Sequence, residues 1–192
     1  MRRIVFVFCL LVSASIAAPG QAADRLEPQH PDWQQQVLRE MPLLGHRNWI
    51  LIVDSAYPLQ SSDGIETIET GADEFDVIRF VMHAVGRSIH VRPDILMDAE
   101  LPFVPEADAP GVSKYRAEIR DLLAGQAVES VPHQQLIDQV DQAGRKVHVL
   151  VLKTNMTVPY SSVFLRLNCK YWSNSAERRL RARMAAGPAG AP

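Results

Sequence analysis

A histidine and an aspartate flank one apolar run of the sequence. His46 precedes the run 49–53, and Asp54 follows it directly. In open α/β sheets ligands gather outside the carboxyl ends of the strands, so Asp54 is placed either to bind a ligand or to cap the next turn. A straight strand rises about 3.3 Å per residue, which puts the two side chains at opposite ends. Contact between them therefore requires a folded-back loop or a second subunit.

A second polar segment follows the apolar run 147–153. Thr154 begins a loop that continues to Pro159, Tyr160 and Ser162. A tyrosine that follows a proline is held stiffly and can stack on a ligand or form a hydrogen bond with it. The alternative for a single tyrosine of this kind is ordinary surface packing.

The elements that position these segments alternate between helical and strand patterns. A helix is expected from Trp33 to Gly45, with Asp32 as its cap, and another over 112–124, with Gly125 as its stop. Two more helices are expected around 75–86 and over 130–144. Strands are expected at 49–53, 65–70, 89–91, 147–153 and 163–167. The proline-rich stretch 92–110 is expected to be mostly loop. The alternation predicts an α/β fold of three layers, in which helices flank a mainly parallel sheet in a single domain.

The N-terminal segment has the pattern of a secretory signal. Arg2 and Arg3 precede the apolar stretch 4–18, and small residues follow up to Ala22. We expect residues 1–22 to be a signal peptide, and the chain to be periplasmic or secreted after cleavage, without stable membrane insertion. The alternative is a retained N-terminal anchor.

The mature chain divides into three parts. Residues 23–31 form a polar linker, 32–172 the domain, and 173–192 a basic segment followed by an Ala/Gly/Pro-rich end. The tail is expected to be a short helix followed by disorder. Its arginines form either a solvated face or a contact with anionic lipid or a partner; they are Arg178, Arg179, Arg181 and Arg183.

Charge and cysteine content exclude several classes of function. The formal net charge of −2 argues against a nucleic-acid binder, which normally carries a basic excess. Cys9 lies in the signal segment, so Cys169 has no disulfide partner in the mature chain. We expect Cys169 to be a small buried residue, with a reactive thiol as the alternative.

The sequence lacks the patterns of metal and nucleotide sites. None of the other histidines has the ligand spacing of a zinc site, and there is no glycine-rich phosphate loop. The histidines concerned are His83, His90, His133 and His148. We therefore expect no metal and no cofactor.

The two polar segments carry matching residues at the spacing of one protein family. These are Gly45, His46, Asp54 and Pro58 in the first segment, and Thr154 and Tyr160, six positions apart, in the second. The sequence thus resembles the D-ribose pyranase and L-fucose mutarotase family, clearly over residues 37–61 and 147–167. Tyr115 and Arg116 also resemble a Tyr-Arg pair of that family.

Several positions depart from the family pattern. Asn155-Met156 stands where the family has Gly-Glu, Ser162 where it has asparagine, and Pro159 where it often has lysine. Part of the sugar-contacting set has therefore changed, which leaves open a pocket that acts on another sugar or a pocket that only binds.

The resemblance implies a monosaccharide ring-form or anomer isomerase that assembles as a homo-oligomer with sites shared between subunits. Opening a hemiacetal needs a proton for the ring oxygen and removal of one from the anomeric hydroxyl, which histidine can do near neutral pH. The family implies His46 as general acid/base, Asp54 and Tyr160 beside it, and substrate contacts from Ser162, Thr154, Tyr115 and Arg116. The rivals are a non-catalytic monosaccharide-binding protein on the same fold, and an envelope-associated protein that uses its arginine-rich tail.

Overall fold

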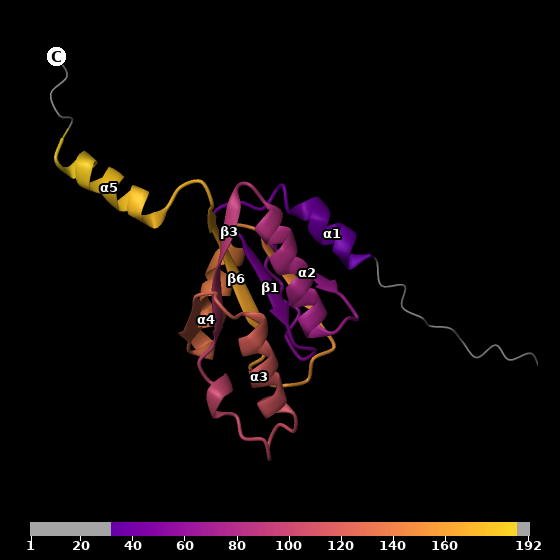
Figure 1. Ribbon diagram of the computed structural model, residues 1–192. Coiled ribbons are helices and arrows are strands. Elements are labelled where there is room, and N and C mark those ends of the chain that lie inside the picture. The colour runs from indigo at the N-terminus through magenta and orange to yellow at the C-terminus, as the bar shows by residue number, and fades with distance from the viewer. Residues whose placement is uncertain (1–31, 188–192) are drawn as a thin grey trace, which may run out of the picture.

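The computed structural model describes residues 32–187 of the chain (Figure 1). The expected signal peptide 1–22 and linker 23–31 lie outside the described residues, as does the end of the tail, 188–192. Helix α1 (Trp33–Glu40) begins where predicted, and its cap Asp32 accepts a hydrogen bond of 3.1 Å from the Gln35 amide.

A six-stranded sheet forms the centre of the molecule. Its strand order is β2-β5-β1-β6-β3-β4, and all neighbours are parallel except that β6 runs antiparallel to both β1 and β3. The strands are β1 (Trp49–Val53), β2 (Ile65–Glu69), β3 (Val91–Asp98), β4 (Val128–Val131), β5 (Val149–Lys153) and β6 (Val163–Cys169). The mainly parallel sheet of the prediction is confirmed.

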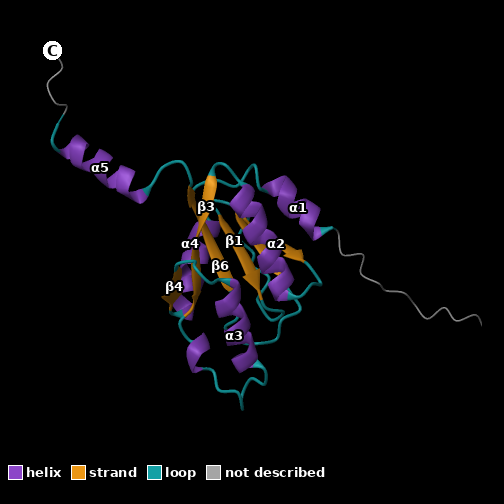
Figure 2. Ribbon diagram, viewed as in Figure 1, coloured by secondary structure: helices purple, strands orange, loops and turns teal. Residues whose placement is uncertain are grey.

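Helices cover both faces of the sheet and complete three layers (Figure 2). Helices α1, α2 (Glu74–Arg87) and α3 (Val112–Leu122) pack on one face, and α4 (His133–Gly144) packs on the other. A short 3₁₀ helix, η1 (Leu101–Phe103), follows β3. The predicted single-domain α/β architecture is thus confirmed.

Strand β1 lies inside both cores. Ile50 and Ile52 contribute to the core beneath α1, α2 and α3, whereas Trp49, Leu51 and Val53 contribute to the core beneath α4. Side chains alternate between the faces of a strand, so a continuous apolar run is what a strand buried on both faces requires. All five residues of β1 are buried, and the chain leaves the core at the next residue, the half-buried Asp54.

The prediction of a loop over 92–110 was wrong for residues 92–98, which belong to strand β3. The strand expected at 89–91 begins only at Val91. Strand β3 continues to Asp98 and passes through Pro93. Pro93 pairs with β6, but β4 pairs only with the residues from Ile95 onward. The missing N–H of the proline therefore falls where β3 has a neighbour on one side only, which a sheet tolerates. The partner strand β4 was also not predicted.

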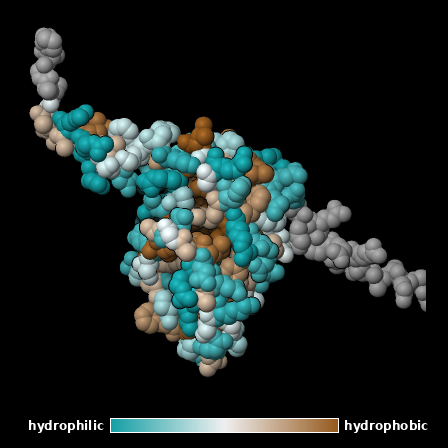
Figure 3. All heavy atoms as spheres, in the orientation of Figure 1, coloured by the Kyte–Doolittle hydropathy of each residue, from teal (hydrophilic) through white to brown (hydrophobic). Residues whose placement is uncertain are grey.

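The C-terminal helix α5 (Asn174–Ala185) extends away from the domain (Figure 1), and none of its residues is buried. Its visible surface is largely hydrophilic with a small hydrophobic spot (Figure 3). The predicted short helix is confirmed. In the described part of the chain, no helix is both long enough and apolar enough to cross a membrane.

Cys169 ends β6 and is half-buried with a free thiol. The prediction of a buried residue was therefore too strong. The residue occupies the last position of its strand, where the core no longer encloses the side chain.

Removal of residues 173–192 is expected to change the free energy of unfolding by less than about 1 kcal/mol, because α5 buries no side chain. Urea denaturation of the full-length and shortened chains measures this. Leu150→Ala, at a fully buried position of β5, is the control and should cost about 2–5 kcal/mol. A truncation as costly as this control would contradict the description of α5 as an independent arm.

Candidate functional site

A cavity of about 620 Å³ opens at the carboxyl end of β1, a size within the range of small-molecule sites. Asp54 lines it together with Tyr57, His133 and Tyr160, which come from the loop after β1, the start of α4 and the loop between β5 and β6. The structure therefore brings two of the predicted residues, Asp54 and Tyr160, into one cavity.

Asp54 is half-buried and held from two sides. Its Oδ1 accepts a 2.8 Å hydrogen bond from the Ala56 amide, which closes the turn after β1. Its Oδ2 accepts a longer bond of 3.4 Å from the hydroxyl of Ser162. The carboxylate thus performs both functions that the sequence left open, since it caps the turn and also lines the cavity.

Tyr160 has a left-handed backbone, with φ of 59°. This conformation is uncommon for a residue with a side chain, and such strain concentrates at functional sites. The ring is 38% exposed and meets the ring of His133 edge-on, with 5.4 Å between centroids. One face of the cavity is therefore aromatic and accessible to a ligand.

His133, which lines the cavity, forms a pair with Asp98 that was not singled out from the sequence. Nδ1 of His133 donates to Oδ1 of Asp98 at 2.9 Å, and Asp98 is only 3% exposed. The His133 amide also donates to both carboxylate oxygens of Glu100 at 3.0 Å. The imidazole is fixed through Nδ1, and its Nε2 has no hydrogen-bond partner within residues 32–187.

Burial and neighbouring charges shift the pKa values of two groups near the Asp54 cavity. Burial raises the pKa of Asp98, the bond from His133 opposes this, and the charge of Asp54 adds a smaller increase. Burial also raises the pKa of Tyr57, with Asp54 again a contributor, so this phenol stays neutral. The charge of Asp54, which lines the cavity, therefore acts on two titratable groups near it.

Two other predicted residues are engaged with the protein itself. The hydroxyl of Thr154, 1% exposed, donates to the Val53 carbonyl at 2.8 Å and joins the ends of β5 and β1. The hydroxyl of Tyr115, 3% exposed, donates to the Ser161 carbonyl at 2.6 Å. In this structure both side chains hold the walls of the cavity and do not line it.

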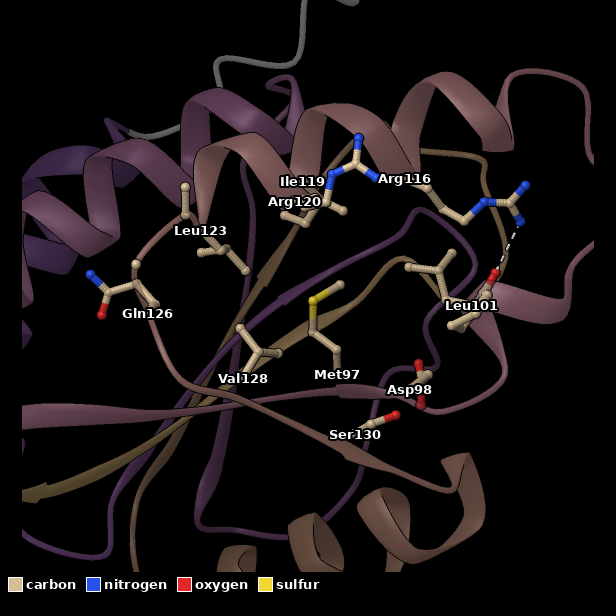
Figure 4. A pocket seen from close by; sticks show the side chains of 13 residues that line it. Met97, Asp98, Leu101, Arg116, Ile119, Arg120, Leu123, Gln126, Val128 and Ser130 are labelled. Atoms are coloured by element: carbon tan, nitrogen blue, oxygen red, sulfur yellow. Dashed lines mark hydrogen bonds between the residues drawn. The ribbon is translucent and has the colours of Figure 1, made fainter.

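Arg116 lies beside a different cavity, of about 510 Å³, between α3 and the β3–β4 edge. Its guanidinium donates to the carbonyls of Leu101 and Val104 at 3.2 and 2.8 Å. Figure 4 shows this contact with Leu101 and the apolar side chains, including Met97 and Ile119, that face the cavity. The structure does not bring Arg116 to Asp54.

His46 lies at the opposite end of β1 from Asp54. It is exposed and borders a small cavity of about 240 Å³ that also includes Asp94 and Arg166. The strand between the two residues spans roughly 17 Å. Within one protomer, therefore, the loop does not fold back and His46 does not meet Asp54.

One group of described residues has side chains of the types that hold metals. The ligand atoms of Glu40, Glu66 and His148 lie within 4.8 Å of one another, with 3.6 Å between His148 Nε2 and Glu66 Oε2. These residues come from the end of α1, from β2 and from the residue before β5, away from the Asp54 cavity.

Comparison with known proteins identifies the family. Residues 30–169 match the RbsD / FucU transport protein family. The chain belongs to this family. Members of the RbsD / FucU family include sugar pyranases, sugar mutarotases and sugar-binding proteins. No curated protein sequence matches the chain.

Solved structures of the family are similar to the chain at low identity. RbsD of Bacillus subtilis, complexed with D-ribose, shares 15% identity with a TM-score of 0.49, over 68% of this chain and 89% of that one. FucU of Bifidobacterium longum shares 15% identity with a TM-score of 0.48, over 68% of this chain and 90% of that one. The fucose mutarotase of Streptococcus pneumoniae, in complex with L-fucose, shares 16% identity with a TM-score of 0.47, over 72% of this chain and 96% of that one.

His133 and Asp98 could have been found by the rule that selected Asp54. Asp98 ends a parallel strand at the same edge of the sheet, but the expectation of a loop over 92–110 concealed that position. His133 was noted only as part of a first helical turn. An α/β fold places such a turn above the carboxyl ends of the strands, where ligands bind.

Tyr115→Phe is expected to lower the free energy of unfolding by about 1–3 kcal/mol, because it removes the buried donor to the Ser161 carbonyl. Urea denaturation measures the change. The matched control is Tyr171→Phe, whose 79% exposed ring should tolerate the change within about 0.5 kcal/mol. Equal effects of the two substitutions would show that the Tyr115 hydroxyl does not hold the loop.

Proposed function

We propose that the protein interconverts ring forms or anomers of a monosaccharide without a cofactor. The observation that carries the proposal is that His133, held by the buried Asp98, lines one cavity with Asp54, in a chain of the RbsD / FucU family. Among the family's solved structures, one contains D-ribose and another L-fucose, and we infer a related sugar as the substrate here.

The proposed chemistry needs a group that can both give and take a proton. Mutarotation opens a hemiacetal, so one proton must reach the ring oxygen and another must leave the anomeric hydroxyl. Histidine changes charge near neutral pH and suits both steps. Asp98 fixes the imidazole of His133 through Nδ1 and stabilises the imidazolium that forms when Nε2 takes a proton.

Asp54, Ser162 and Tyr160 are the groups that we propose to hold the sugar. The Asp54 carboxylate can accept hydrogen bonds from sugar hydroxyls, and the Ser162 hydroxyl next to it can donate or accept. The exposed Tyr160 ring provides a flat apolar surface for the C–H face of a pyranose.

His46 enters the proposal only through an oligomer. It lies at the far end of β1 within its own protomer, so a site that uses both histidines must take His46 from a neighbouring subunit. We propose a homo-oligomer in which His46 of one copy reaches the Asp54 cavity of the next, with His46 as a second general acid/base.

The alternative is a monosaccharide-binding protein without catalysis. It is favoured by Ser162 and Met156, which stand where the resemblance leads one to expect asparagine and glutamate. On this alternative the cavity and its aromatic wall serve to bind sugar, and the histidine pair only orients it.

We also propose export to the periplasm or the medium, because residues 1–22 have the composition of a secretory signal. Fractionation of cells that produce the full chain tests this: a shortened, periplasmic or secreted protein supports export, whereas an uncleaved cytoplasmic protein contradicts it.

His133→Ala is expected to abolish accelerated anomer or ring-form exchange, with a loss of about 10²–10⁴-fold, because it removes the proton-transferring group. Saturation-transfer NMR on ribose, fucose and related sugars measures the exchange. The control His83→Ala changes an exposed histidine of α2 outside the cavity and should keep the wild-type rate. Sugar binding without acceleration in the wild type would establish the binding-only alternative.

Mixing two inactive variants is expected to restore activity if sites are shared. When His46→Ala and His133→Ala subunits are unfolded together and reassembled at random, about a quarter of the sites combine an intact His133 with an intact His46 of a neighbour. Exchange NMR on the mixture measures the recovery. Sites confined to one subunit would give no recovery, which would contradict the proposed role of His46.

A further inference from the structure

Glu74, the first residue of α2, is a fully buried acidic residue that the proposed reaction does not use. Its exposed fraction is 0%, and it lies in the same helix face as Phe75, Val77 and Ile78. Among the described residues, no lysine, arginine or histidine forms an ion pair with it. An unpaired buried carboxylate is costly, and a carboxyl group in such a place avoids the cost by staying neutral.

The hydrogen bonds around Glu74 lead to the same conclusion from geometry. The Tyr115 hydroxyl has one proton, and its oxygen lies 2.6 Å from the Ser161 carbonyl but 3.5 Å from Glu74 Oε1. The short contact takes the proton, since a hydrogen bond weakens steeply with distance. Glu74 is therefore left without a good donor from Tyr115.

Two further polar atoms in this region have no partner among the described residues. They are Oε2 of Glu74 and Oγ of Ser161, both without exposed surface. The Ser161 hydroxyl can donate to the Glu74 carboxyl group in either protonation state, and a proton on Glu74 would add a second donor that can point to the Ser161 or the Tyr115 oxygen. The geometry that favours a neutral Glu74 is therefore its complete burial with one weak donor contact at 3.5 Å and with no ion pair among the described residues.

The charged and titratable groups around Glu74 favour the neutral form. Burial is the largest cause and the charges of Asp54 and Asp73 act in the same direction, so that the pKa of Glu74 is raised to about 8. The nearby hydroxyl groups of Ser161 and Tyr115 lower the pKa, but by less than these effects raise it. These groups come from the end of β1, the cap of α2, the β5–β6 loop and α3.

Glu74 also stands next to the proposed sugar site. Ser161 adjoins Ser162, whose hydroxyl contacts Asp54 Oδ2. A negative charge on Glu74 would face both the carboxylate of Asp54 and the carbonyl of Ser161, with no cation to compensate it. Ionisation would therefore disturb the wall that holds Ser162 against Asp54.

We infer that Glu74 is a positioning residue that holds the Ser161–Ser162 segment as a neutral carboxylic acid, and that loss of its proton in alkaline solution loosens the Asp54 cavity. The effect on the sugar rests on the proposed function. The state of the proton does not, and it can be measured on the protein alone.

The sign of the effect on stability follows from linkage. The Glu74 carboxyl ionises near its ordinary value of 4.5 in the unfolded chain and at about 8 in the folded one, so the folded state binds more protons between these values. Its contribution to stability is complete below pH 4.5 and is lost as the pH rises to about 8. Glu74→Gln, which stays neutral, does not lose it.

The first experiment measures the proton directly. Infrared spectra of the full protein with ¹³C-labelled glutamate, recorded from pH 6 to 10, should contain one isotope-shifted band of a protonated carboxyl group at neutral pH, which disappears on alkaline titration. The label separates Glu74 from Asp98, and the band should be absent in Glu74→Gln. Absence of any such band in the wild type at pH 6.5 overturns the inference. This result does not depend on whether the variant folds, because it is measured on the wild-type protein.

The second experiment compares melting temperatures across the same pH range. Glu74→Gln should gain on the wild type as the pH rises, and the difference should level off above about pH 8. The matched control Glu118→Gln makes the same change at an exposed position of α3 and should follow the wild type at every pH. A constant difference between Glu74→Gln and wild type would contradict a proton on Glu74.

The third experiment concerns the sugar. After subtraction of uncatalysed exchange, the wild-type acceleration should fall at least severalfold between pH 7 and 9.5, and Glu74→Gln should lack this fall. The same alkaline fall in both proteins overturns the positioning role. If neither protein accelerates exchange of any sugar, sugar binding measured by saturation-difference NMR replaces the rate; absence of both defeats the proposed function, while the infrared result still decides the proton on Glu74.

Discussion

The burial of negative charge at the carboxyl end of the sheet is the constraint on which the site depends. Asp54, Asp98 and Glu74 converge there, and each meets the cost of burial in a different way. Asp54 stays half-buried and accepts bonds from an amide and a hydroxyl. Asp98 is paired with His133, and Glu74 forms no ion pair with any residue that the structure describes. The three acids therefore differ in environment: Asp54 is half-buried and accepts two hydrogen bonds, Asp98 is buried and holds His133, and Glu74 is an acid that we infer to be neutral.

The side chains around this cluster divide into those that hold the cavity and those that face it. Thr154 and Tyr115 use their hydroxyls on backbone carbonyls and fix the loop between β5 and β6. That loop carries Tyr160 in a strained conformation, which a loosely held segment would relax. Residues that match the family pattern therefore have two different places: Thr154 and Tyr115 hold the loop, and Tyr160 lines the cavity.

The length of β1 explains why one protomer offers only part of the proposed machinery. The strand must cross the core to be buried on both faces, and this puts Asp54 and His46 at opposite edges. His133, on a helix that packs across the sheet, is the histidine that the fold itself delivers to Asp54. Among the histidines of residues 32–187, His133 is the one that lines the Asp54 cavity, and this is why the proposed site takes His46 from another copy.

The sequence by itself determined the elements whose pattern is local. The run at β1, the cap at Asp32 and the stop at Gly125 were readable because periodicity, capping and a positive φ of 81° depend on neighbouring residues alone. These were enough for the layered fold and for Asp54 at the edge of the sheet. Tertiary structure decided the rest. Strand β3 passes through Pro93 because of where β4 stops pairing, and the composition of the segment does not reveal this. Strand pairing and helix packing bring Asp98 to His133 and Tyr115 to Glu74, although these residues lie far apart in the chain. The charges and protons of such groups depend on neighbours that no local sequence pattern specifies.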